Sequence, residues 1–118
     1  MHSIEWTGTH LRLLDQRRLP HQTVWLDLYS HNEVAQAISD MIVRGAPAIA
    51  IAGGYGLAMA ITAGVDRSSA VHTLVESRPT AVNLQWAMDR LSNIPDADVL
   101  SEVIRIHEED LAINHAIG

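Results

Sequence analysis

The sequence has 118 residues, of which 47% are hydrophobic and 19% are charged, and its formal net charge is −6. This length and composition predict one folded domain spanning 1–118 and argue against a disordered chain. A net negative charge gives no electrostatic reason to bind nucleic acid or an anionic lipid surface, although one local cationic pocket would suffice for a small anion. The sequence contains no cysteine, which excludes disulfides and thiol nucleophiles from it.

Three short apolar or β-branched runs predict a small antiparallel sheet within residues 1–29. Residues 4–6 and 11–14 are separated by Thr7-Gly8-Thr9, which is typical of a hairpin. Residues 23–28 supply a third strand. The sheet therefore precedes the part of the chain, 30–118, whose apolar spacing is helical.

Ser30 is placed to cap the first helix, because Glu33 follows at the spacing of a capping box. Apolar residues at helical spacing then predict one buried stripe, which consists of Val34, Ile38, Met41 and Ile42. We expect Gly45 to end this helix.

The segment 47–63 is apolar all round, which predicts a central buried helix that Pro47 begins. The surrounding run 46–65 is about as long as a membrane span, but its glycines and alanines favour a tightly packed helix instead. The N-terminus lacks the basic and apolar regions of a signal peptide. We therefore expect a cytoplasmic protein with no membrane partner.

Later helices are predicted over 71–76, from Pro79 onward, and after Pro95, with Asp96 or Asp98 as the last N-cap. The polar run 64–69 is interpreted as a break. The predicted fold class is α+β and mostly helical, with a three-stranded sheet followed by a bundle of four to five helices. The predicted core consists of these residues: Ile38, Met41, Ile49, Ile51, Leu57, Met59, Ile61, Trp86, Leu91, Val103 and Ile104.

The segment Arg44-Gly45-Ala46-Pro47 places a guanidinium and a glycine where one helix ends and a buried helix begins. Free N–H groups and the helix dipole favour an anion at such a start, and arginine matches the geometry of a phosphate. The spacing is equally compatible with an ordinary helix entrance and a surface arginine.

The segment Arg78-Pro79-Thr80, followed by Asn83, repeats this arrangement. Two arginines ahead of two proline-started helices could converge on one anion. Two unrelated helix entrances are the alternative.

Other polar or glycine-rich segments carry weaker signals. Ala52-Gly53-Gly54-Tyr55-Gly56 lacks the spacing of a dinucleotide fingerprint and is interpreted as helix packing. The run from His107 to Asp110, with His115, lacks the spacing of a zinc motif and is interpreted as a solvated helix face. We predict no metal site and no cofactor, and we assign no role to the scattered histidines 2, 10, 21, 31 and 72.

Taken in order, several motifs resemble the methylthioribose-1-phosphate isomerases. They are Leu11-Arg12-Leu13-Leu14-Asp15-Gln16, Leu19-Pro20, Arg44-Gly45-Ala46-Pro47-Ala48-Ile49, Tyr55-Gly56, Arg78-Pro79-Thr80-Ala81-Val82-Asn83-Leu84 and Asn114-His115-Ala116-Ile117-Gly118. The resemblance spans the whole chain. It implies a small sheet and helices in an N-terminal domain, followed in the family by a Rossmann-like C-terminal domain, and commonly a homodimer.

The resemblance also implies that Arg44, Gly45, Ala46 and Arg78 contact the phosphate of a small sugar-phosphate substrate. The family converts 5-methylthioribose 1-phosphate to 5-methylthioribulose 1-phosphate in methionine salvage. Its catalytic cysteine and aspartate belong to the C-terminal domain, so we expect no catalytic residue in these 118 residues and no turnover by them alone.

The 118 residues depart from the family pattern in two respects: we expect them to exclude the C-terminal domain, and they have more glycine over 50–54. A face that normally meets the absent domain would be exposed, and we therefore expect self-association. Two alternatives remain open. One is a ribose-bisphosphate isomerase, and the other is a regulatory or assembly module like the related subunits of the exchange factor for translation initiation factor two.

Overall fold

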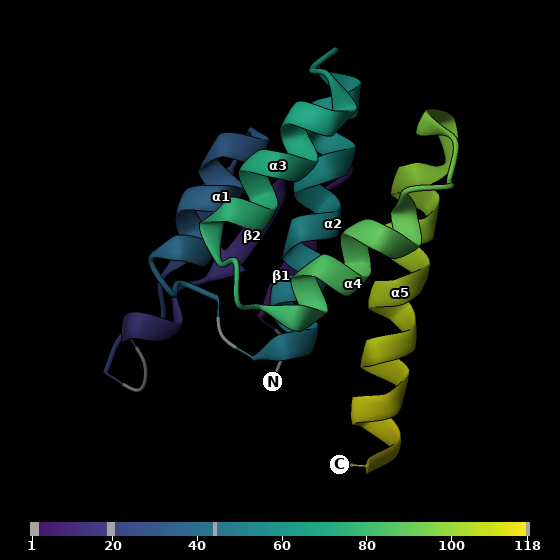
Figure 1. Cartoon of the computed structure of the whole chain (residues 1–118). Coiled ribbons are helices and arrows are strands. Elements are labelled where there is room, and N and C mark those ends of the chain that lie inside the picture. The colour runs from purple at the N-terminus through teal and green to yellow at the C-terminus, as the bar shows by residue number, and fades with distance from the viewer. Residues whose placement is uncertain (1–2, 19–20, 44, 118) are drawn as a thin grey trace.

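A three-stranded antiparallel sheet followed by five α-helices forms the chain in the computed structural model (Figure 1). The structure describes residues 3–18, 21–43 and 45–117, with side chains for all of these except 16 and 111–117. The helical part surrounds one long central helix, and a single hydrophobic core joins the sheet to the helices. The predicted fold class is therefore confirmed.

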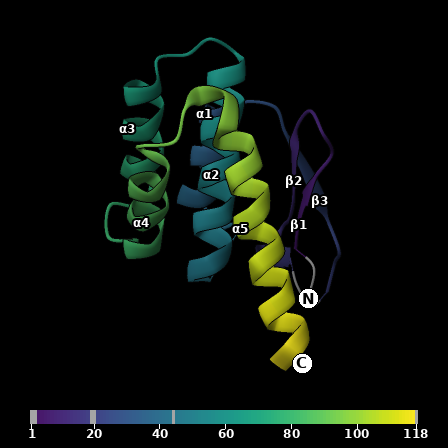
Figure 2. The same ribbon diagram turned by 90° about the vertical axis from the view of Figure 1, so that its right-hand side faces the viewer.

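The sheet consists of β1 (Ile4–Trp6), β2 (Leu11–Leu14) and β3 (Trp25–Leu28), in the order β1-β2-β3. Leu13 lies opposite Ile4 of β1 and Leu26 of β3. The predicted hairpin is confirmed, and the third strand is two residues shorter than 23–28. Leu11 and Leu13 are fully buried, since alternate residues of a strand point to the same face. Figure 2 shows the sheet on one side of the central helix and two other helices on the opposite side.

A short 3-10 helix, η1 (Gln16–Arg18), follows β2 and lies next to the buried carboxylate of Asp15. Asp15 is 1% exposed, and its two oxygens accept hydrogen bonds of 3.0 Å from Nε and Nη2 of Arg17. Arg18 lies 3.6 Å from the same carboxylate. The hydrogen bond from Arg17 outweighs burial and lowers the pKa of Asp15.

Helix α1 (His31–Ser39) begins as predicted, because the Ser30 hydroxyl accepts a 3.2 Å hydrogen bond from the backbone N–H of Glu33. The prediction that Gly45 ends this helix is wrong. Helix α1 ends at Ser39, and the chain reverses through Met41, whose φ is 63°. The N–H of Met41 donates to the carbonyl of Ile38, and the next N–H donates five residues back, which is the Schellman pattern.

The central helix α2 (Ala46–Thr62) is buried continuously from residue 49 to residue 60, as its apolar composition predicts. It packs against α1, α3, α4, α5 and the sheet. Its glycines allow neighbouring helices to pack closely, as predicted. An ideal Cβ at Gly53 would lie 2.3 Å from Leu84, and one at Gly54 would lie 3.0 Å from Val103. In the described part of the chain, no helix is long and apolar enough to cross a membrane.

The last three helices are α3 (Arg67–Ser77), α4 (Val82–Leu91) and α5 (Asp96–Ile117). Helix α3 begins within the predicted polar break, because Asp66 accepts a 3.0 Å hydrogen bond from the N–H of Ser69. The prediction that Pro79 starts α4 is wrong, since residues 79 and 80 form a turn and Ala81 is the N-cap. Asp96 is the first helical residue of α5 and pairs at 2.9 Å with Arg67.

Two predicted core residues lie at the surface instead. Met41 is 44% exposed and Trp86 is 49% exposed, while Ile61 and Ile104 are only partly buried. Trp86 is displaced because Leu84 occupies the space beside Gly53, which turns a different face of α4 toward α2. Other predicted positions are buried: Ile38, Ile49, Ile51, Leu57, Met59, Leu91 and Val103.

A buried polar pair joins α5 to α2. The Tyr55 hydroxyl lies 2.7 Å from Nδ1 of His107, and the Tyr55 ring stacks on Trp6 of β1 at 5.0 Å between centroids. Burial, and secondarily the charge of Glu108, raises the pKa of Tyr55 to about 12. The tyrosine therefore stays neutral and links the sheet, the central helix and the last helix.

Candidate phosphate-binding pocket

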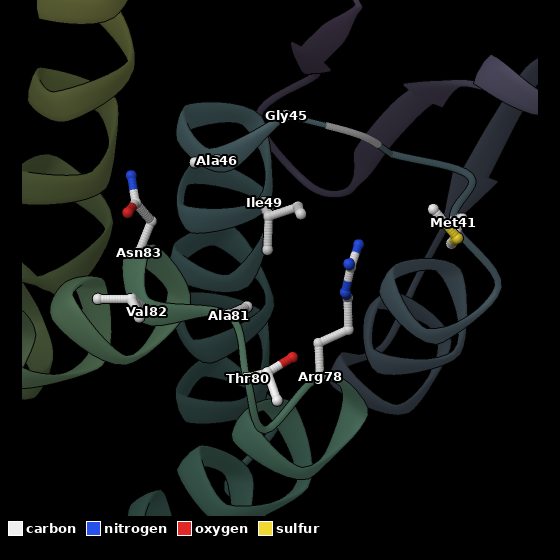
Figure 3. Close-up of a pocket in the computed structure, with 9 residues that line it drawn as sticks. All are labelled: Met41, Gly45, Ala46, Ile49, Arg78, Thr80, Ala81, Val82 and Asn83. Carbon is white, nitrogen blue, oxygen red and sulfur yellow. The ribbon is translucent and has the colours of Figure 1, made fainter.

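A pocket of about 400 Å³ opens where α2 begins, between the end of α1 and the turn that joins α3 to α4 (Figure 3). Both motifs that the sequence analysis singled out contribute to its wall. Its described lining consists of Met41, Gly45, Ala46, Ile49, Arg78, Thr80, Ala81, Val82 and Asn83.

The start of α2 supplies backbone donors to this pocket. Gly45 is the N-cap, and its φ of 91° lies in the region that favours glycine. None of the described side chains caps the helix, and Pro47 has no N–H. The N–H groups of Ala46 and Ala48 therefore have no acceptor within the helix, and the positive end of the helix dipole lies here.

Arg78 supplies the positive charge. It is the C-cap of α3 and is partly exposed, and Figure 3 shows its guanidinium between Ile49 and Met41. No other described residue of the lining is charged. The pocket is therefore a cationic site on a chain of net negative charge.

Arg78 differs from the other arginines that the structure describes. Its guanidinium forms no hydrogen bond or ion pair with another described residue. Each of the others pairs with a carboxylate: Arg12, Arg17, Arg18, Arg67, Arg90 and Arg105. A guanidinium that faces a pocket without a carboxylate is available to an anionic ligand.

The turn before α4 adds polar groups at the other side of the pocket. Figure 3 shows the Thr80 hydroxyl on the side of Arg78 and the Asn83 amide pointing away from it, toward α5. Thr80 can donate a hydrogen bond to a ligand oxygen held by Arg78. Asn83 also lines a second hollow, with Trp86 and Arg90, between α2, α4 and α5.

The structure brings together Gly45, Ala46 and Arg78, which the sequence places in two separate motifs. Arg44 lies outside the described residues, so the predicted convergence of the two arginines stays a prediction. Only the first motif places its proline in the first turn of a helix. Among the described residues, no three histidine or acidic side chains gather closely enough to hold a metal ion.

Comparison with known proteins places the chain in a family. A model of the initiation factor 2 subunit family matches residues 42–117, which include every described residue of the pocket except Met41. The chain belongs to the initiation factor 2 subunit family. Within this family it is similar to the methylthioribose-1-phosphate isomerase of Alkalilimnicola ehrlichii, with 45% identity over 98% of this chain and 38% of that protein. The chain thus spans about 38% of the length of that curated relative.

Two solved structures share the fold of this member of the initiation factor 2 subunit family. The 5-methylthioribose 1-phosphate isomerase from Pyrococcus horikoshii superimposes with a TM-score of 0.81 and 31% identity, over 91% of this chain and 36% of that one. The delta subunit of translation initiation factor eIF-2B from A. fulgidus gives a TM-score of 0.75 and 32% identity, over 94% of this chain and 38% of that one.

Sequence reasoning missed four apolar members of the pocket wall: Met41, Ile49, Ala81 and Val82. The apolar stripe of the first helix predicts Met41 in the core, and the all-apolar segment 47–63 predicts Ile49 there. Val82 is 77% exposed, and its position in the second motif, between Thr80 and Asn83, was the available signal.

Proposed function

We propose that this chain supplies the phosphate-binding pocket of an isomerase that converts 5-methylthioribose 1-phosphate to 5-methylthioribulose 1-phosphate. The observation that carries the proposal is the guanidinium of Arg78, which pairs with no other described residue, beside the start of α2, which no described side chain caps. The names of the similar proteins support the choice of substrate.

In this proposal the phosphate accepts hydrogen bonds from Arg78 and from the N–H groups at the start of α2. Gly45 holds the backbone so that these groups face the ligand, and Arg44 adds a second guanidinium. Binding energy at the phosphate fixes the position of the sugar, which lowers the entropic cost of reaction at the neighbouring carbons.

The chemistry requires more than this pocket. The substrate carries its phosphate on the anomeric oxygen, so its ring cannot open by the route available to a free hemiacetal. The enzyme must labilise the ring and move a proton between the first two carbons, which needs an acid or base residue shielded from water. We propose that these groups lie outside the present residues.

Steady-state kinetics of the protein that carries this chain test the proposal. Arg78→Ala should lower kcat/KM for 5-methylthioribose 1-phosphate by about 10- to 100-fold, the size of one lost charged hydrogen-bonding group. Arg78→Lys should recover little of this loss, since an ammonium does not replace a planar two-donor fork. Arg105→Ala is the matched control, because Arg105 is an exposed arginine on α5, paired with Glu109. Unchanged kcat/KM for Arg78→Ala would contradict the proposal.

A second candidate is a regulatory or assembly module without catalysis, which the likeness to the eIF-2B delta subunit favours. A module used only for packing has no need for a free guanidinium in a pocket. Calorimetry with 5-methylthioribose 1-phosphate separates the two candidates, because the module predicts neither binding heat nor a rise in melting temperature.

A further inference from the structure

Met41 has an unusual backbone conformation at the edge of the candidate pocket. Among the described residues it is the only non-glycine with a positive φ, at 63°. It occupies the position after the α1 C-cap, where its N–H bonds the carbonyl of Ile38 at 3.2 Å and the N–H of Ile42 bonds that of Ala37 at 3.0 Å. Glycine usually occupies this position, because a Cβ makes the left-handed conformation costly.

The fold makes little use of the Met41 side chain. It is 44% exposed, whereas Ile38 and Ile42 on the same stripe are buried. A glycine would therefore end α1 at lower conformational cost and lose little packing, since Met41 lies outside the buried core. Strained backbone conformations of this kind cluster at active sites and ligand contacts.

The same side chain lines the pocket that contains Arg78. Figure 3 shows Met41 on one side of the guanidinium and Ile49 on the other. One pocket thus combines a guanidinium that can bind a phosphate with an exposed, flexible thioether side chain. The polar part suits one end of a sugar phosphate, and the apolar part suits a substituent without hydrogen-bonding groups.

We infer that Met41 is a specificity-determining residue that contacts the apolar 5-substituent of the sugar while Arg78 holds the phosphate. This inference rests on the proposed function. A methylthio group gains contact with the thioether side chain and loses little hydration. A second phosphate or a hydroxyl at that carbon would lose water without gaining a hydrogen-bonding partner from Met41. The pocket therefore discriminates against a ribose bisphosphate.

The test compares two substrates that differ only in the methylthio group, 5-methylthioribose 1-phosphate and 5-deoxyribose 1-phosphate. Two substitutions suit the left-handed backbone and remove the apolar side chain, Met41→Gly and Met41→Asn. Each should lower kcat/KM for the methylthio sugar about 10-fold, which is typical of a lost apolar contact in a pocket, and change it less than about two-fold for the deoxy sugar. Met41→Leu should retain the preference.

Two further measurements separate specificity from folding. The melting temperature of Met41→Gly should equal or exceed that of the wild type, because glycine relieves the left-handed strain. Tyr29→Ala is the control, since Tyr29 is an exposed apolar residue that lines a different hollow beside Trp6. It should leave the ratio of the two kcat/KM values unchanged.

Equal losses for both sugars, no loss for either, or a lower melting temperature for Met41→Gly would overturn the assignment of Met41. If the wild type turns over neither sugar, the proposed function fails and the assignment of Met41 fails with it. If the wild type is active and Arg78→Ala is impaired while the preference survives in Met41→Gly, only the assignment of Met41 is wrong.

Discussion

Gly54→Ala should destabilise the fold even though alanine favours a helix. Helix propensity alone predicts a gain of about 1 kcal/mol. The new methyl group, however, would lie 3.0 Å and 3.1 Å from the two γ-carbons of Val103 on α5. Val103 is 1% exposed and β-branched, so it has one favoured rotamer in a helix and cannot rotate both methyl groups away. Overpacking of this kind costs about 1–3 kcal/mol, which leaves a net loss of about 1 kcal/mol.

A double-mutant cycle isolates this contact. Val103→Ala alone should cost about 2 kcal/mol, because it removes two buried methyl groups and leaves a cavity. Adding Gly54→Ala to that variant should raise stability by about 1 kcal/mol, since the propensity gain returns and the new methyl group fills the cavity. Urea unfolding followed by circular dichroism measures all four proteins. If Gly54→Ala stabilises the wild-type background as much as the Val103→Ala background, the close approach of α5 to α2 does not constrain residue 54.

Two other substitutions test buried polar groups. Tyr55→Phe should cost about 1 kcal/mol in urea unfolding, because it removes the buried hydrogen bond to His107 but keeps the ring that stacks on Trp6; an unchanged midpoint would count against that bond. Asp15→Asn should lower the melting temperature most at neutral pH. The folded-state pKa of Asp15 is lowered by the hydrogen bond from Arg17, so its stabilisation is present above the unfolded carboxyl pKa of about 3.9 and disappears as the pH falls through the folded value. A gap between wild type and variant of equal size at pH 7 and pH 2 would contradict this.

Local patterns in the sequence predict most of the secondary structure because their signals are short in range. The strands follow from short apolar or β-branched runs, α2 follows from its continuous apolar run, and the start of α1 follows from Ser30 and Glu33. The end of α1 was misplaced because glycine is the usual signal, and Met41 takes the left-handed conformation instead.

The start of α4 was misplaced for a related reason. Pro79 suits the first turn of a helix, but the carbonyl of Arg78 accepts a 3.0 Å hydrogen bond from the N–H of Ala81, which closes a turn over the proline. The inward face of α4 depends on where α2 has room for a side chain. Gly53 provides that room for Leu84, and the buried stripe of α4 is Leu84, Ala87, Met88 and Leu91, whereas the prediction placed Trp86 in the core.

The candidate site was predictable in its parts and not in its assembly. Gly45 and Ala46 lie in a motif that is typical of a helix start, and Arg78 lies in a second motif in which an arginine precedes a proline. Their meeting in one pocket depends on the packing of the α3–α4 turn beside the start of α2, which joins residues distant in the sequence. The absence of a described carboxylate partner for Arg78 likewise emerges only from the folded arrangement of the other charges.

The most direct test of the central claim is a nuclear magnetic resonance titration of the isotope-labelled protein with 5-methylthioribose 1-phosphate. The pocket predicts that the backbone N–H signals of Ala46 and Ala48 and the Nε–H signal of Arg78 shift together, with one dissociation constant, while the Nε–H signal of Arg105 stays in place. Signals of Ala46, Ala48 and Arg78 that remain unchanged at saturating ligand would contradict the assignment of this pocket as the phosphate site.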